Sequence, residues 1–328
     1  MKLKKCAALL LVSSCLLTGC TTSSAKKVDS KYVVASLEKG NKTKNIFADN
    51  LYKDIIDNSS NNSTVFNAVL QNLVDQKFPV NDDMKEDAAT IIKQIKSAYK
   101  SNYGDNYKDS LNQALTSAGY KNLSEYRQKM IKQIQYANFL LDYIDDHFDD
   151  VFNDYYQQCA PKYVSLIKIS VSDTSSPTDD ETSKLNEVKE LISNTDKSFG
   201  DIAQDYSNDS TSRSLGIVDS KDTSGIANSY GKDVFNAIEA LSEGQVSDVI
   251  TGDNGYYFVK VTSTDKKTLK KELKKTDIDS PLLAYDDYLQ YVVYNSYKIN
   301  YKDKDIKKIV QEVVNKALEE RKAERGEA

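Results

Sequence analysis

The sequence is poor in the side chains that most often carry covalent or metal chemistry. It has no tryptophan and, among 328 residues, one histidine and four cysteines. Cys6, Cys15 and Cys20 lie in the first 20 residues, so Cys159 is the one thiol further along. A Ser-His-Asp triad at His147 has little support, and a Cys/His zinc site has none. With no glycine-rich phosphate or dinucleotide motif either, we expect no metal and no cofactor.

The net charge excludes a further class of partner. The chain carries a formal charge of −5, so we expect no binding to nucleic acid. The charge is also uneven, because residues 161–265 contain 9 basic and 18 acidic residues. This asymmetry predicts two separately built parts.

The N-terminal segment has the pattern of an export signal. Three lysines precede an apolar run that is short for a membrane span, which predicts a signal peptide over residues 1–19. The run ends in Leu-Thr-Gly-Cys, which resembles the lipobox of bacterial lipoproteins and implies lipidation of Cys20. The alternative is an ordinary cleaved signal with a chance cysteine. Residues 20–31 then form a flexible tether, and the lipid places the protein at the outer face of the cell membrane.

Residues 32–160 are predicted to be mainly helical. A short strand is expected over 32–40, and apolar stripes of helical period cover 85–99 and 122–148. Asn122 and Glu125 have the spacing of a helix N-terminal capping box. His147 follows among aspartates, where we expect a solvated or carboxylate-paired ring, and Cys159 is expected to be a small apolar residue with at least half of its surface buried.

The pattern changes after residue 160. Strand and helix signals alternate over residues 161–265 in the order β-α-α-loop-α-β-β, which is typical of a compact α+β domain. A basic connector is expected from Lys266 to Lys275, and helix from about 282 to 325. These last helices, within residues 266–328, are expected to pack back on the N-terminal helices.

Several segments of residues 161–265 resemble the parvulin-type peptidyl-prolyl isomerases. FGDIAQDYSNDSTS (199–212), AIEALSEGQVSDVI (237–250) and GYYFVKV (255–261) follow the order and spacing of that family. Residues 33–55 resemble the first strand and helix of the PrsA lobe. The resemblance implies an α+β protein, with a mostly helical foldase lobe like that of SurA and PrsA. It also implies that a parvulin-like domain with a small antiparallel sheet is inserted in this lobe.

The family's usual active-site residues are largely replaced. Leu166 and Tyr257 stand where the family has two hydrogen-bonded histidines, and leucine forms no hydrogen bonds. Asp209 matches the position of a family aspartate or cysteine, although an acid after a helix is also a common turn residue. Peptide-bond rotation needs no covalent intermediate, so an active isomerase and an inactive binding domain both remain open.

The resemblance implies a membrane-anchored foldase that assists unfolded or partly folded secreted proteins. It leaves open whether the chain forms a homodimer. A second alternative is a lipoprotein that binds a fixed ligand or surface and has no chaperone role. Candidates for client contact are four tyrosines spaced by three, a pattern that helix packing also produces: Tyr285, Tyr288, Tyr291 and Tyr294.

Overall fold

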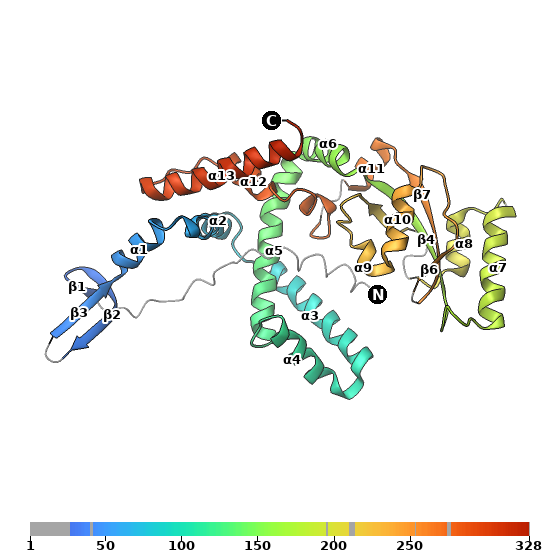
Figure 1. Ribbon diagram of the computed structural model, residues 1–328, viewed down its shortest axis with the longest axis horizontal. Helices are drawn as coiled ribbons and strands as arrows, with labels where there is room; N and C mark the ends of the chain where they lie inside the picture. Colours follow the sequence, from blue (N-terminus) through green and yellow to red (C-terminus); the bar gives the residue numbers. More distant parts are fainter. Residues whose placement is uncertain are drawn as a thin grey trace. The chain divides into compact units, whose positions relative to one another are not determined.

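The computed structural model describes residues 27–39, 42–194, 196–209, 214–252, 254–273 and 277–327 (Figure 1). The expected signal peptide (1–19), the expected lipidation site Cys20 and most of the expected tether lie outside the described residues. The described chain forms two compact units. Residues 80–287 make the larger one, and residues 27–79 together with 288–327 make the smaller one.

The smaller unit joins segments from both ends of the described chain. An antiparallel sheet in the order β1-β2-β3 is followed by helices α1 and α2, and two C-terminal helices complete the unit. The elements are β1 (Lys27–Val28), β2 (Lys31–Lys39), β3 (Lys42–Phe47), α1 (Ala48–Ile56), α2 (Asn62–Lys77), α12 (Leu289–Ser296) and α13 (Lys304–Glu324). Helix α13 packs against both α2 and α12.

Aromatic side chains fill the contact between α2 and α12. Phe66 of α2 is fully buried. Its ring centroid lies 4.9 Å from that of Tyr291 and 5.1 Å from that of Tyr294. Such stacked and edge-on pairs add to the apolar burial. The C-terminal segment therefore packs on an N-terminal helix more than 200 residues away in sequence.

The larger unit begins with four helices: α3 (Asp82–Tyr103), α4 (Tyr107–Ser117), α5 (Leu123–Asp146) and α6 (Phe148–Cys159). Helices α3 and α5 pack through one cluster of buried apolar side chains: Met84, Ala88, Ile92, Met130, Ile131 and Ile134. At the start of α5 the Asn122 side chain accepts from the Glu125 amide at 2.9 Å. The Glu125 carboxylate accepts from the Lys121 amide at 2.7 Å. The predicted helix start is therefore correct.

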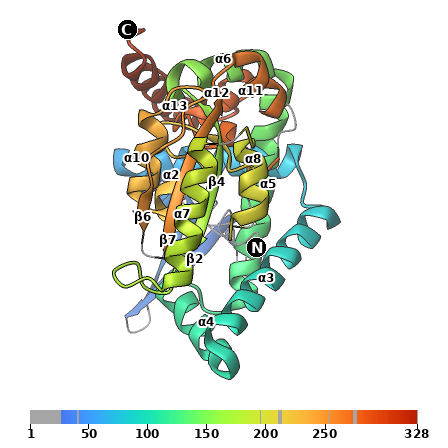
Figure 2. The same ribbon diagram turned by 90° about the vertical axis from the view of Figure 1, so that its right-hand side faces the viewer.

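A four-stranded antiparallel sheet in the order β5-β4-β7-β6 follows. Its elements are β4 (Lys162–Ser170), α7 (Asp179–Asn194), α8 (Phe199–Tyr206), β5 (Gly216–Val218), α9 (Ile226–Tyr230), α10 (Lys232–Ala240), β6 (Ile250–Gly252) and β7 (Gly255–Ser263). Figure 1 shows α7 and α8 on one face and α9 and α10 on the other, and Figure 2 shows the same sheet turned by 90°. The predicted α+β class with a small antiparallel sheet is confirmed.

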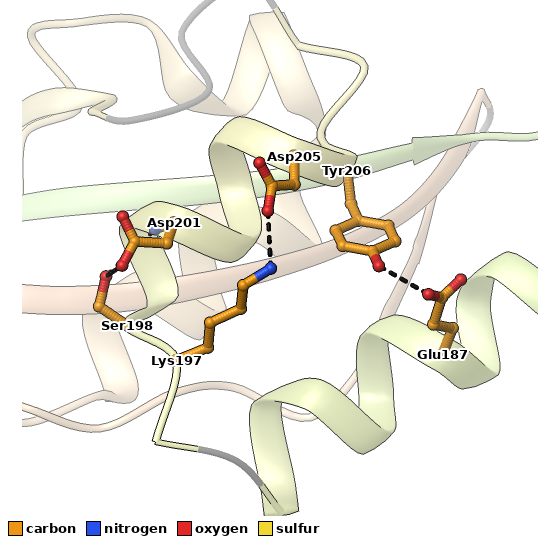
Figure 3. Close-up of polar contacts among 6 residues, drawn as sticks. All are labelled: Glu187, Lys197, Ser198, Asp201, Asp205 and Tyr206. Carbon is orange, nitrogen blue, oxygen red and sulfur yellow. Dashed lines mark hydrogen bonds and ion pairs between the residues drawn. The ribbon is translucent and has the colours of Figure 1, made fainter.

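The contact between α7 and α8 combines an apolar core with exposed polar pairs (Figure 3). The Tyr206 hydroxyl donates to Glu187 at 2.6 Å, which raises the pKa of Tyr206. Lys197 pairs with Asp205 at 2.7 Å. Exposed pairs of this kind contribute little to stability, so the core residues beneath, such as Phe199, hold α8 on the sheet.

The expected basic connector after the sheet is a helix, α11 (Lys266–Leu273). Leu269 and Leu273 lie one turn apart and are buried. The Asp265 side chain accepts from the amide and the hydroxyl of Thr268, both at 2.8 Å, and so caps the first turn. The sequence prediction was wrong here because four lysines among these eight residues obscured two apolar residues at helical spacing.

A buried polar network joins α6 to the loop after β5 within the larger unit. Asp219 is fully buried and accepts a hydrogen bond from the Tyr155 hydroxyl at 2.8 Å. It also accepts from the amide of Lys221 at 3.0 Å. Burial is the main cause that raises the pKa of Tyr155, with Asp219 adding to it. Because the carboxylate has several donors, its burial is compensated.

Candidate functional site

The strand register brings Leu166 and Tyr257, the positions that the family resemblance assigns to two histidines, onto one face of the sheet. In the antiparallel pair β4–β7, Leu166 lies opposite Val259 and Lys168 lies opposite Tyr257. Because side chains alternate along a strand, Leu166, Lys168 and Tyr257 share a face. Tyr256 points to the opposite face and packs against the α7–α8 core. Tyr256 and Tyr257 therefore pack into the apolar cores on opposite faces of the sheet.

Leu166 and Tyr257 belong to one apolar cluster. Leu166 is fully buried and Tyr257 is 4% exposed. Beside them, a Cβ placed on Gly252 would lie 2.7 Å from the Tyr257 ring, so only glycine leaves room for this ring position. An aliphatic side chain and a phenol ring thus occupy these two positions, and an imidazole pair is absent from them.

Asp209 reaches this cluster through a residue that sequence reasoning missed. The Tyr230 hydroxyl donates to Asp209 Oδ1 at 3.3 Å. The Tyr230 ring stands edge-on to Tyr257, with centroids 6.2 Å apart. The Lys168 ammonium also lies over the Tyr257 ring, 5.6 Å from its centroid. Asp209, Tyr230, Tyr257 and Lys168 therefore form a continuous row of contacts.

The strand period could have identified Lys168, since it lies two residues after Leu166. The sequence indicates Tyr230 less strongly, because it is the last residue of the five-residue helix α9, just before Gly231. Half-buried apolar side chains from four separate segments flank the cluster: Tyr230, Phe235, Leu241 and Ile250. Such a surface suits the contact and desolvation of an apolar ring, whereas the side chains of Leu166 and Tyr257 supply no imidazole for acid–base chemistry.

Lys162 stabilises the C-terminal end of α10, the helix that carries Phe235. Its ammonium donates to three carbonyl groups at the end of α10: Ile238 at 3.0 Å, Glu239 at 2.7 Å and Leu241 at 3.0 Å. The last carbonyls of a helix lack partners within the helix, and a cation there is favourable. This contact fixes the position from which Phe235 and Leu241 reach the cluster.

The four candidate client-contact tyrosines do not form one helical stripe. Tyr285 precedes α12 and is 2% exposed, and its hydroxyl donates to Asp154 at 2.8 Å. Tyr294 is 4% exposed and its hydroxyl bonds that of Tyr301 at 2.5 Å. Tyr288 and Tyr291 are half-buried. Tyr285 and Tyr294 therefore pack inside their units, and Tyr288 and Tyr291 alone retain substantial exposed surface.

The lone histidine and the remaining cysteine have structural surroundings. His147 is exposed at the end of α5, and its ring stacks on that of Tyr143 with centroids 4.2 Å apart. Cys159 is free and fully buried. Burial, with a smaller effect of Asp219, raises its pKa to about 12. No cluster of potential metal ligands occurs among the described residues.

Comparison with protein families matches the region built around this sheet. Residues 149–274 match the model described as PPIC-type PPIASE domain, so this part of the chain is a parvulin-type domain. The curated relatives include the foldase protein PrsA of Staphylococcus epidermidis and of Staphylococcus aureus, each 30% identical over 141 residues. Each match covers 40% of this chain and 41% of the relative. Over these 141 residues the chain is similar to the PrsA foldases.

Solved PrsA structures also match the chain. The crystal structure of PrsA from Bacillus subtilis matches with 20% identity and a TM-score of 0.39, over 85% of this chain and 98% of that chain. Foldase protein PrsA from Streptococcus pneumoniae matches with 19% identity and a TM-score of 0.37, over 85% and 99%. Within the described part of the chain, no helix combines the length and apolar character needed to cross a bilayer.

Proposed function

We propose that the chain is a lipid-anchored foldase on the outer face of the cell membrane. It assists unfolded or partly folded secreted proteins there. The observation that carries this proposal is the half-buried apolar surface that Tyr230, Phe235 and their neighbours form over the Tyr257 cluster in a PPIC-type domain. The names of the curated relatives and the lipobox-like sequence ending at Cys20 support it. The anchor and the secreted clients belong to the proposal.

The parvulin-type domain, in this proposal, binds extended segments that contain proline. A proline ring packs on the half-buried surface over Tyr257, and catalysis is weak or absent because the imidazole pair is missing. Rotation about the X-Pro bond must cross a barrier of about 18–20 kcal/mol. An apolar surface lowers that barrier only if it binds the twisted amide more tightly than the planar one. In this proposal Asp209, whose Oδ1 accepts from the Tyr230 hydroxyl, is the one polar group at a position that the family resemblance marks as part of the active site.

Two assays on protein that begins after Cys20 test the proposal. The first follows cis-to-trans conversion of a short X-Pro peptide, and the second follows aggregation of an unfolded client. We expect suppressed aggregation with little or no acceleration of isomerisation. Acceleration that is lost in Asp209→Ala would instead establish an active isomerase. Failure in both assays would contradict the foldase proposal and favour a lipoprotein that binds a fixed ligand.

A further inference from the structure

The β1–α1 segment (residues 27–39 and 42–56) carries most of the strongly exposed large apolar side chains of the described chain. Eight such side chains occur among the described residues, and seven of them lie between Val28 and Ile55. No side chain that the structure describes in this segment is buried. Single exposed apolar residues are normal on a protein surface, but their concentration in one short segment marks an interaction surface.

Helix α1 presents its exposed apolar residues as one stripe. Leu51, Tyr52 and Ile55 recur at the spacing of one helix face, and all three are exposed. The helical period places Asp57 on the far side of α1 and Asp54 at the margin of the stripe. The stripe itself is therefore free of carboxylates.

The sheet beside α1 is positively charged, although the chain as a whole is negative. Residues 27–44 contain five lysines and two acidic residues, so their formal charge is +3, against −5 for the whole chain. The Lys27 ammonium lies 4.6 Å from the centroid of the Tyr32 ring, so cationic and aromatic groups share one surface. Lys31 pairs with Asp49 of α1 at 3.1 Å, but both side chains are more than half exposed, and such pairs are weak.

Two tyrosines of the segment are suited to a boundary between water and lipid. The Tyr52 hydroxyl donates to the Asp303 carboxylate at 2.5 Å, which holds α1 at the start of α13. The Tyr52 and Tyr32 side chains are each nearly half exposed. Tyrosine combines an apolar ring with a polar hydroxyl and is enriched at membrane–water interfaces.

The place of the segment in the chain favours a membrane surface over a second copy of the chain. Six residues separate Cys20 from Lys27, and a chain of this length spans at most about 25 Å. A lipid on Cys20 therefore keeps the segment next to the bilayer at a high effective concentration. A second copy packed through the same segment would bring two sheets of like charge together, whereas anionic headgroups attract this sheet.

We propose that the β1–α1 segment binds the surface of an anionic bilayer. Its exposed apolar side chains, such as Tyr32, Leu51 and Ile55, enter the boundary between headgroups and acyl chains, and the lysines of the sheet contact the headgroup phosphates. This inference rests on the lipid anchor of the proposed function. The contact adds a second attachment beside the lipid and determines which side of the smaller unit faces the bilayer.

Vesicle flotation of the chain without residues 1–20 tests the proposal. This protein retains every described residue and carries no lipid. We expect roughly tenfold tighter binding to vesicles of phosphatidylglycerol and phosphatidylcholine than to phosphatidylcholine alone, and weaker binding with added salt. Tyr32→Ser should weaken binding about fivefold. Tyr103→Ser makes the same change at a tyrosine of α3 that is 52% exposed, against 46% for Tyr32, and should change binding less than about twofold.

Absence of vesicle binding by the unaltered chain would overturn the proposal, and this result does not depend on the folding of any variant. Equal weakening by Tyr32→Ser and Tyr103→Ser would also overturn it. Light scattering tests the other occupant. A dimer that Leu51→Ser dissociates, while vesicle binding is unchanged, would assign the surface to a second copy of the chain and overturn the membrane contact.

The aggregation assay separates this inference from the foldase function. Suppressed aggregation without vesicle binding removes the membrane contact alone, whereas vesicle binding without suppressed aggregation removes the foldase function alone. Mass spectrometry of Cys20 in the exported full chain tests the lipid anchor independently. An unmodified Cys20 would remove the anchor, and with it the argument that the segment is held beside the bilayer.

Discussion

Histidines introduced at positions 166 and 257 test whether side chains at these two positions are close enough to form a hydrogen bond. Leu166 is fully buried and Tyr257 is 4% exposed. The register makes them diagonal neighbours on one face of β4 and β7. Diagonal neighbours in an antiparallel pair lie about 7–8 Å apart, which is within the joint reach of two imidazole rings. The double variant should therefore regain a hydrogen bond that neither single variant can form.

The expected energies follow from burial. Leu166→His loses apolar contacts and buries a ring nitrogen without a partner, so it should lower the free energy of unfolding by about 3 kcal/mol. Tyr257→His loses aromatic packing against Tyr230 and should cost about 2 kcal/mol. The regained hydrogen bond should make the double variant more stable than the sum of the single effects by about 1 kcal/mol.

Hydrogen exchange of the β4 and β7 amides at pH 8 measures these changes, because free histidine is mostly neutral there. A coupling of about 1 kcal/mol corresponds to roughly fivefold greater protection than additivity predicts. Ile167→His combined with Tyr257→His is the matched control, since Ile167 is also fully buried but faces the α7–α8 core. Additive behaviour of the 166/257 pair, or equal coupling in the control, would refute the reasoning.

Two further predictions concern stability. Lys162→Met should destabilise the end of α10 by about 2 kcal/mol, because three carbonyls lose their charged donor. Faster amide exchange near Leu241 measures this change. Lys232→Met, at the exposed start of α10, is the control. An unchanged exchange rate would contradict it. The raised pKa of Cys159 means that the folded chain retains the thiol proton while the unfolded chain loses it above about pH 8.5. Stability should therefore fall as the pH rises from about 9 toward 12, and the urea midpoint of Cys159→Ala should fall less between pH 8 and pH 10; equal falls in both proteins would exclude this contribution.

Local patterns were sufficient for most helices and strands. The capping pair Asn122 and Glu125, the alternation in β4 and the turn before β7 each depend on residues close in sequence. Local composition misled the prediction for α11, where lysines hid the pair Leu269 and Leu273. Periodicity also suggested one tyrosine stripe, but η4 (Pro281–Leu283) and α12 (Leu289–Ser296) are separate elements.

The sequence was enough to establish the α+β class and the parvulin-type domain, because strand period and the order of motifs are properties of the chain alone. Packing between distant segments required the fold. Tyr230 meets Asp209 and Tyr257, and Arg127 meets the carbonyl of Lys85, because helices and strands far apart in sequence are brought together. The burial and the partners of a polar group arise from these long-range contacts. Local sequence patterns therefore encode neither the row of contacts at Tyr257 nor the hydrogen bond between Arg127 and the Lys85 carbonyl.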